Sequence, residues 1–537
     1  MSKLLLIPSE LCLAIVAHLE VKDVVALRMT CIYLFEITKE RSIWLSLLRA
    51  QEATSPLPAF ARKLADSDSS LDLASIEEMV QSVFRTQRDW LQPRQTPLHE
   101  LHRLVVPEYW NHEHHDMNSK TQNICGLEVF LDRWLIVIYS NNVQLWDLFP
   151  GTPKDPHGPG SAWLKHSGAQ ILRGLVPTQF DTIAYHATSL SAERDAIYVA
   201  VASDIVTRVI CFRLPTDAPD DTETPMPVCK DDYPLEGLSI RAYEPSSNVL
   251  VAYRSQVMSL VSLNTLVCWN ITLDAGEALW SNLTGVHFLT PRHVLCCWSH
   301  SIELFVFSGS FASSQNPGED KGRIASPAEV EFHQEEFTGI TFRSVSFSDH
   351  RVSTSTRDRT TTLSCGILAY DVLRGIYHYR VDVHFPAEFS SEQHAFKNES
   401  CPNLVKPLSW NVTLVSAHHM AQLIESTAQP TEMPRPRSGF TRGTHGFLTS
   451  CALGPQGTRG IWVERRRHST NRAMYGFNLT RSIDSEAVDE AKGLGGKLIY
   501  EVSSFDLRDD VTHCAFSEVT GKIALGTRGG DVFVLKQ

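Results

Sequence analysis

Apolar residues in the first fifty positions recur at helical spacing. Leu11, Ile15 and Leu19 return every fourth position, which places them on one face of a helix. A second apolar set follows Asp23, a residue type suited to the N-cap, and a third set runs on to Trp44. The pattern therefore predicts three short helices.

A further helical pattern lies between residues 51 and 120, among stretches rich in Pro and Ser. Its apolar members are Ile76, Met79, Val80, Val83 and Phe84. We interpret this region as a helical spacer.

From about residue 121 the pattern changes to short runs rich in Val, Ile, Tyr, Phe and Trp, separated by turn residues. The last unit has strand-like runs at 512–516, 522–527 and 532–535. A closing strand of such a unit is counted seven times, at Val143–Leu148, Arg208–Leu214, Leu266–Ile271, Ile302–Phe307, Ile367–Val372, Met474–Leu479 and Val532–Leu535. The recurrence predicts a β-propeller of six to eight blades, seven by this count, and a β-sandwich or two is the alternative.

The expected fold class is thus multidomain, α followed by all-β. The boundaries are 1–50 for the helix cluster, 51–120 for the spacer and 121–537 for the propeller. Because the last unit shows three strands, we expect Leu104, Val105 and Val106 to pair beside Val532–Leu535 and close the ring.

Composition narrows the function classes. The chain has 43% hydrophobic and 20% charged residues and a formal net charge of -12, which is typical of folded protein and argues against nucleic-acid binding. Polar residues interrupt the longest uncharged stretch, so no membrane span is expected, and Pro8 and Glu10 break a signal-like start. Twelve cysteines without a C-x-x-C pair favour a reduced compartment, cytoplasmic and possibly also nuclear.

The N-terminal pattern resembles the F-box family without a gap. The matching positions are Ile7, Pro8, Glu10, Leu11, Ile15, Leu19, Asp23, Leu27, Cys31 and Trp44. The resemblance implies a three-helix cluster that packs against the Skp adaptor subunit of cullin ubiquitin ligases through these residues, Asp23 excepted. Many members of the family carry a basic residue and then an aromatic pair after the Cys. This chain instead has Ile32, Tyr33, Leu34 and Phe35 at these positions. The alternative is an unrelated helical hairpin whose apolar residues form its own core.

The β region resembles WD-type propellers most visibly at Leu145, Trp146 and Asp147, although the Gly-His signature of that family is absent. At about 60 residues a unit, its blades must carry long inserted loops.

Candidate chemistry is sparse. No nucleophile elbow, phosphate-binding loop or dinucleotide fingerprint occurs, so we expect no catalysis and no cofactor. The His-rich run at 112–116 lacks the spacing of a metal site and is expected to be a solvated loop. Four arginines, Arg357, Arg359, Arg465 and Arg467, could bind an acidic or phosphorylated target, and the alternative is solvated turn charge.

These observations favour a non-catalytic substrate-recognition subunit of a Skp-cullin-F-box ubiquitin ligase. Its partners would be the Skp adaptor, a cullin through that adaptor, and a protein target held by the propeller. Two alternatives remain: a scaffold acting outside ubiquitin transfer, and a propeller enzyme with an unrecognised site.

Overall fold

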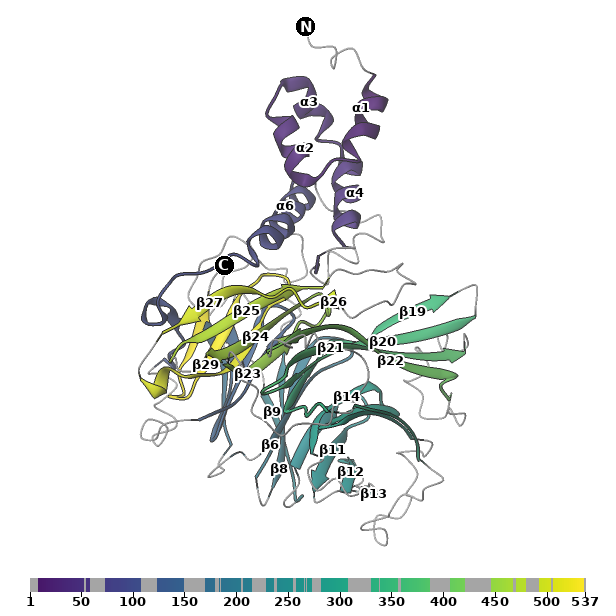
Figure 1. Cartoon of the computed structure of the whole chain (residues 1–537), viewed down its shortest axis with the longest axis vertical. Coiled ribbons are helices and arrows are strands. Elements are labelled where there is room, and N and C mark those ends of the chain that lie inside the picture. Colours follow the sequence, from purple (N-terminus) through teal and green to yellow (C-terminus); the bar gives the residue numbers. More distant parts are fainter. Residues whose placement is uncertain are drawn as a thin grey trace, which may run out of the picture.

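The computed structural model in Figure 1 shows a helical part standing on a ring of β-sheets. The structure describes residues 8–52, 55–57, 73–107, 123–148, 170–178, 183, 185–203, 206–214, 228–235, 239–254, 257–264, 266, 268–272, 282–307, 330–337, 339–355, 359–386, 406–420, 446–466, 470–479, 492–503 and 506–535. None of the helices in these ranges is long and apolar enough to cross a membrane.

In the described residues before the ring there are five α-helices, and we call them the helical head. They are α1 (Ser9–Val16), α2 (Val21–Arg28), α3 (Ile32–Ile37), α4 (Arg41–Glu52) and α6 (Leu73–Asp89). The predicted third helix is two helices, because the chain turns at Thr38 before α4 begins. The predicted N-cap is also wrong: Glu20 caps α2, and Asp23 lies in its first turn, where its negative charge still favours the positive end of the helix dipole.

The spacer helix α6 supplies much of the core of the helical head. Ile76 and Val80 on α6 are fully buried and pack in one cluster with Trp44 and Leu48 of α4. The Gln51 amide also donates a hydrogen bond of 3.1 Å to the carbonyl of Val80. The apolar residues within 73–89 therefore recur at helical spacing because this face of α6 packs against α4. The helix is not a spacer surrounded by solvent.

Seven sheets form the ring, which is a seven-bladed β-propeller. Blade 1 contains β2 (Ile124–Phe130), β3 (Trp134–Tyr139), β4 (Asn142–Asp147) and β5 (Ile171–Pro177); blade 2 contains β6 (Tyr185–Leu190), β7 (Ala196–Ala202), β8 (Thr207–Arg213) and β9 (Val228–Tyr233). Blade 3 contains β10 (Ser239–Glu244), β11 (Val249–Arg254), β12 (Val257–Ser262) and β13 (Cys268–Thr272); blade 4 contains β14 (Leu283–Thr290), β15 (His293–Trp298), β16 (Ser301–Phe307) and β17 (Val330–Glu336).

The remaining blades are less regular. Blade 5 contains β18 (Ser344–Phe347), β19 (Arg351–Ser355), β20 (Thr360–Asp371), β21 (Gly375–Pro386), β22 (Ser409–His419) and β26 (Lys492–Gly493). Blade 6 contains β23 (Gly446–Leu453), β24 (Arg459–Arg466), β25 (Arg472–Asn478) and β27 (Lys497–Val502). Blade 7 contains β28 (Val511–Phe516), β29 (Ile523–Thr527), β30 (Val532–Leu535) and, from far upstream, β1 (His102–Arg103). A short 3-10 helix, Leu98–Glu100, precedes β1, and another, Leu507–Asp509, precedes β28.

The predicted count of seven is confirmed, but only one of the counted strands, the one at β13, closes its blade. Five of them correspond to third strands of their blades, namely β4, β8, β16, β25 and β30, whereas β13 is a fourth strand and β20 a second strand. Two of the outer strands were missed because they are exposed and polar. Val228–Tyr233 and Val330–Glu336 carry several charged residues and lack the apolar run on which the count depended.

Ring closure occurs close to the predicted place. His102 pairs with Val534 and Arg103 with Phe533, and the Leu104 N–H donates to the Val532 carbonyl at 2.9 Å. The closing strand is thus two residues upstream of the predicted one, and Val105 is 65% exposed. The last blade receives its fourth strand from upstream of the rest of the propeller.

Residues 90–101, which we call the neck, run along the outer edge of blade 6. Trp90 is fully buried and stacks on Phe516 at 5.3 Å between ring centroids. The Arg94 N–H donates to the Ile499 carbonyl at 2.8 Å, and the Tyr500 hydroxyl donates to the Thr96 carbonyl at 2.9 Å. The neck therefore packs against the propeller through both side-chain and backbone contacts.

A second tether joins the head to the propeller near Leu57. Its backbone N–H and carbonyl both bond the side-chain amide of Gln456, at 3.2 and 2.8 Å. The Gln456 turn is itself held by the buried carboxylate of Glu518, which accepts from the N–H groups of Gln456, Thr458 and Arg459. The head is consequently attached to blades 6 and 7 at two separate points.

We predict that Trp90→Ala lowers the free energy of unfolding by about 3–5 kcal/mol, because truncating a buried Trp removes apolar contacts and leaves a cavity. Urea unfolding of the purified chain measures this. Val105→Ala, an exposed position close by in sequence, should change stability little. Equal urea midpoints for the two variants would show that the neck is not anchored by its indole.

The innermost strands pack against one another around the ring axis and carry partly buried histidines. Burial lowers the pKa of His186 on β6 to about 4, and nearby His513 and Arg241 act in the same direction. Burial, aided by His350, lowers the pKa of His287 on β14 to about 3. At Gly126 a Cβ would lie 2.5 Å from the Nε2 atom of His186, so the space for that imidazole depends on the glycine. These rings are neutral in the folded chain.

Acid should therefore destabilise the propeller. In the unfolded chain each imidazole takes up a proton below its ordinary pKa of 6.5, whereas folded His186 does so only near pH 4. The stabilisation that comes from keeping these imidazoles neutral is fully present above pH 6.5 and is lost as the pH falls. For His186 the free energy of unfolding decreases by about 2 kcal/mol between about pH 7 and pH 5. Urea titrations across this range should show a shallower pH dependence for His186→Gln. An unchanged dependence in that variant would contradict the prediction.

Candidate protein-docking surface on the helical head

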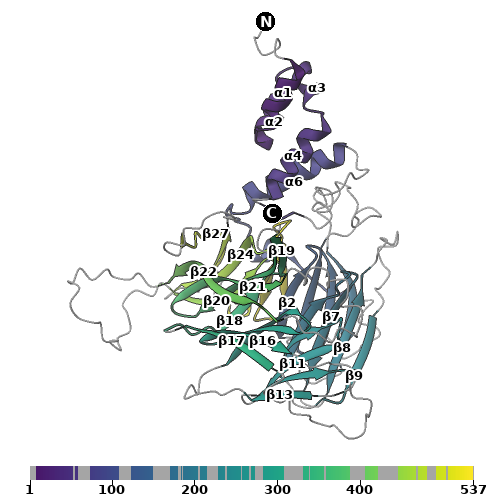
Figure 2. The same ribbon diagram turned by 90° about the vertical axis from the view of Figure 1, so that its right-hand side faces the viewer.

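The helical head leaves a group of large apolar side chains in solvent. Its exposed members on and between the first three helices are Leu11 (56%), Ile15 (53%), Met29 (82%), Ile32 (82%), Tyr33 (37%) and Phe35 (38%). We call them the head patch. Figures 1 and 2 show that α1 and α3 lie at the end of the head away from the propeller.

The head patch is exposed because the opposite faces of the same helices are used for packing. On α1 the buried side chains are Cys12 and Val16, so Leu11 and Ile15 lie on the outward side. On α3 only Leu34 is buried. The Tyr33 hydroxyl of α3 interacts with the Cys12 thiol of α1. Desolvation, and secondarily this thiol, raise the pKa of the hydroxyl. The two helices therefore present their outward residues as neighbours.

The predicted adaptor-binding residues divide into two groups. Pro8, Glu10, Leu11 and Ile15 are exposed, whereas Ile7 lies outside the described residues. The other group contributes to the head itself: Leu19 and Leu27 are partly buried against its core, Cys31 caps α3 and is partly buried, and Trp44 is fully buried. Trp44 lies behind this surface with a fully buried side chain, and its role in adaptor binding stays a prediction.

Met29 and Ile32 are the most exposed apolar residues of the head patch, and the sequence reasoning did not select them. A signal was present. Ile32 begins the segment at which this chain departs from the basic and aromatic pattern of many F-box proteins, and Met29 directly follows the last residue of α2. A large apolar side chain left in solvent is a candidate contact residue.

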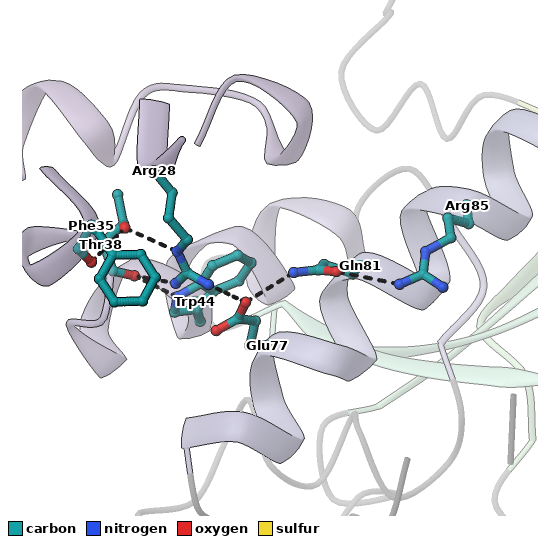
Figure 3. A network of polar contacts seen from close by, with 7 residues as sticks. All are labelled: Arg28, Phe35, Thr38, Trp44, Glu77, Gln81 and Arg85. Carbon is teal, nitrogen blue, oxygen red and sulfur yellow. Dashed lines mark hydrogen bonds and ion pairs between the residues drawn. The ribbon is translucent and has the colours of Figure 1, made fainter. Parts of the chain in front are cut away.

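A polar network centred on Arg28 fixes the head internally, as Figure 3 shows. The Arg28 guanidinium donates to the Thr38 hydroxyl at 3.1 Å and to its carbonyl at 3.0 Å, and it forms an ion pair with Glu77 of α6. It also lies 5.2 Å from the ring centroid of Trp44, whose indole N–H donates to the same Thr38 carbonyl at 2.8 Å. The network therefore joins α6 to α2, to α4 and to the C-terminal end of α3.

Gln81 and Arg85 extend this network along α6. The Gln81 amide donates to the Glu77 carboxylate at 2.9 Å, and Arg85 donates to the Gln81 carbonyl oxygen at 3.3 Å. Residues one helical turn apart lie on the same face, so the chain of contacts follows α6 toward the neck.

The predicted target-binding arginines are only partly described. Arg359 is exposed, precedes β20 and has a φ of 48°, and Arg465 is exposed near the end of β24. They belong to blades 5 and 6, and Arg357 and Arg467 lie outside the described residues. Their role in target binding stays a prediction.

Arg465 contributes to a small hollow at the edge of blade 6 with Arg472, Asp506 and Asp510. There Asp510 pairs with Arg472 at 2.5 Å and with Arg528 at 3.0 Å, so the charges of the hollow largely neutralise one another. Within the described ranges, no three His, Cys, Asp or Glu residues are placed to hold a metal ion, and the His-rich run at 112–116 lies outside those ranges.

Comparisons with known proteins assign the chain to no family. No family model matches the chain, and no curated protein matches it. Among solved structures, the β-propeller domain of Myceliophteria thermophila Cps50 (Swd1) has a TM-score of 0.41 at 11% identity, covering 78% of this chain and 98% of that one. The C-terminal WD40 domain of Sif2 has a TM-score of 0.35 at 7% identity, covering 78% and 96%.

Drosophila Plexin A, in a complex with Semaphorin 1b, has a TM-score of 0.37 at 9% identity, covering 83% of this chain and 88% of that one. Scores and identities this low carry no inference about function. The class of the protein, a seven-bladed β-propeller with an N-terminal helical head, rests on its own sheet order.

A double-mutant cycle on Arg28 and Glu77 should give a coupling free energy of about 1 kcal/mol or more, because the pair is largely shielded, at 14% and 20% exposure. Urea unfolding of Arg28→Ala, Glu77→Ala and the double variant, followed by helical circular dichroism, measures it. Glu36 near the end of α3 and Lys39 just after it form the control pair: both side chains are exposed, and the pair should couple by less than about 0.5 kcal/mol. Equal coupling in the two cycles would remove the proposed role of the Arg28 network.

Proposed function

We propose that this chain is the substrate-recognition subunit of a Skp-cullin-F-box ubiquitin ligase. The helical head docks the Skp adaptor and, through it, a cullin, while the propeller holds a protein target. Catalysis is supplied by other subunits.

The head patch is the observation that carries this proposal. Its members Leu11 and Ile15 fall on positions of the F-box pattern and are more than half exposed, although they are aliphatic. Exposed apolar groups of this kind mark protein interaction sites. The patch also lies on the helices farthest from the propeller, so a partner as large as an adaptor can approach without contacting the blades.

The attachment of the head to the propeller supports the same function. A ligase must hold its target at a set distance from the enzyme that transfers ubiquitin, and this requires a stiff connection. Trp90 and Leu57 both contact the propeller, and the Arg28 network joins α6 to the other helices of the head. An adaptor bound at α1 and α3 would consequently have a defined position relative to the blades.

Target capture is assigned to the loops of the propeller, because its strand faces are occupied by packing between blades. Arg359 and Arg465 remain candidates for contact with an acidic or phosphorylated target, since guanidinium groups bind carboxylate and phosphate bidentately.

Truncation of the head patch tests the adaptor interface. The Leu11→Ala and Ile15→Ala double variant should lose at least ~30-fold in affinity for a purified Skp adaptor, equivalent to about 2 kcal/mol, because central apolar anchors contribute most of the binding energy. Isothermal titration calorimetry measures the affinity. Leu19 is not used, since its packing against the core would also alter folding.

The matched control is Leu507→Ala, an equally exposed aliphatic position (64%) on the propeller, which should bind adaptor as the wild type does. Circular dichroism must show intact helices in both proteins. Wild-type affinity in the double variant would refute the F-box assignment. Recovery of adaptor without cullin from cell extract would instead favour the scaffold alternative.

A further inference from the structure

Two cysteines face each other at the outer edge of blade 2. Cys211 lies on β8 and Cys229 on β9, and the antiparallel register pairs them directly. Directly opposed residues in such a pair have Cβ atoms about 4.5–5.5 Å apart. A disulfide requires about 3.5–4.5 Å, so a small adjustment of the edge strand suffices. Both cysteines are free thiols.

The two thiols differ in their exposure to solvent. Cys229 is the one exposed cysteine within the described part of the chain, and β9 is the outermost strand of its blade. Cys211 is partly buried on the neighbouring strand. A small oxidant in solution therefore meets Cys229 first, with Cys211 already beside it.

The surroundings of Cys211 suit a thiol that reacts second. Burial has the largest effect on the Cys211 thiol and raises its pKa, and Cys229 and Asp195 raise it further. The hydrogen bond from the Tyr198 hydroxyl and the charge of Arg213 lower it. Tyr198 is also the cross-strand partner of Cys211 on its other side. Once Cys229 is oxidised, the hydroxyl and guanidinium groups can stabilise the attacking thiolate.

We propose that Cys211 and Cys229 form an oxidative modification site at which hydrogen peroxide produces a cross-strand disulfide. The Cys229 thiolate attacks one peroxide oxygen, the O–O bond breaks, and after proton uptake water leaves and a sulfenic acid remains. The Cys211 thiolate then attacks the sulfenic sulfur, so that an S–S bond forms, the S–O bond breaks and a second water leaves. Two electrons pass from the two thiols to one peroxide, which is reduced to two waters.

The other described cysteines do not combine an exposed thiol with a second thiol directly opposite it. Cys296 and Cys297 are fully buried, and burial raises the pKa of both thiols well above the ordinary value. Cys514 is also buried, with a pKa raised to about 11. The proposed bond would join the outermost strand of blade 2 to its neighbour, so oxidation should stabilise that edge.

Peroxide treatment of the full chain, followed by non-reducing peptide mapping, tests the proposal. We expect a Cys211–Cys229 peptide, a free-thiol count lower by two, a higher thermal unfolding midpoint and full reversal by dithiothreitol. Cys268 of blade 3 provides the matched control. It is partly buried and pairs across strands with Val261, so Cys268→Ser should leave the reaction unchanged.

Single variants separate the two steps. Cys211→Ser should retain a sulfenic acid at Cys229 that dimedone labels, and Cys229→Ser should show neither label nor disulfide. Differential alkylation of the wild type gives the same assignment without any substitution. The proposal is overturned if the wild type shows dimedone-labelled Cys229 without the disulfide, a disulfide to another cysteine, or no thiol loss.

Discussion

Pairing of the first strand with the last determines the arrangement of this chain. A ring of blades must be closed by some segment, and here His102 and Arg103 supply the fourth strand of blade 7 beside Phe533 and Val534. The residues just upstream are thereby drawn along blades 6 and 7, where Trp90 is buried. Since α6 ends at Asp89, the position of the head follows from the way the ring closes.

The head shows how one set of apolar residues can be divided between folding and binding. A cluster as small as residues 8–52 cannot bury all its apolar surface by itself. Here α6 covers one side, which is why Trp44 and Leu48 are fully buried, and no described element covers Leu11 and Ile15 on the other. The surface left open is the part on which the proposed adaptor interface depends.

Periodicity predicted features that depend on neighbours close in sequence and missed those set by distant packing. It located α6 and the count of seven blades, because apolar spacing directly reflects a buried face. The register of β1 was displaced by two residues, since alternation does not specify which N–H groups join the ladder. Trp44 was assigned to the surface because nothing local shows that a helix beginning at Leu73 covers it. In the candidate site, exposure of Met29 and Ile32 likewise depends on which helix faces remain uncovered.

The shared strand also bears on how such a protein could arise by gene fusion. A propeller gene that began at residue 121 would encode six full blades and a seventh with an open edge, a surface that favours aggregation. Recombination that exchanged the head would therefore have to keep residues from about Trp90 to Leu104 with the propeller. We expect the segment that must be inherited together with the propeller to begin within the neck. This is upstream of about residue 121, where the sequence changes to short β-strands.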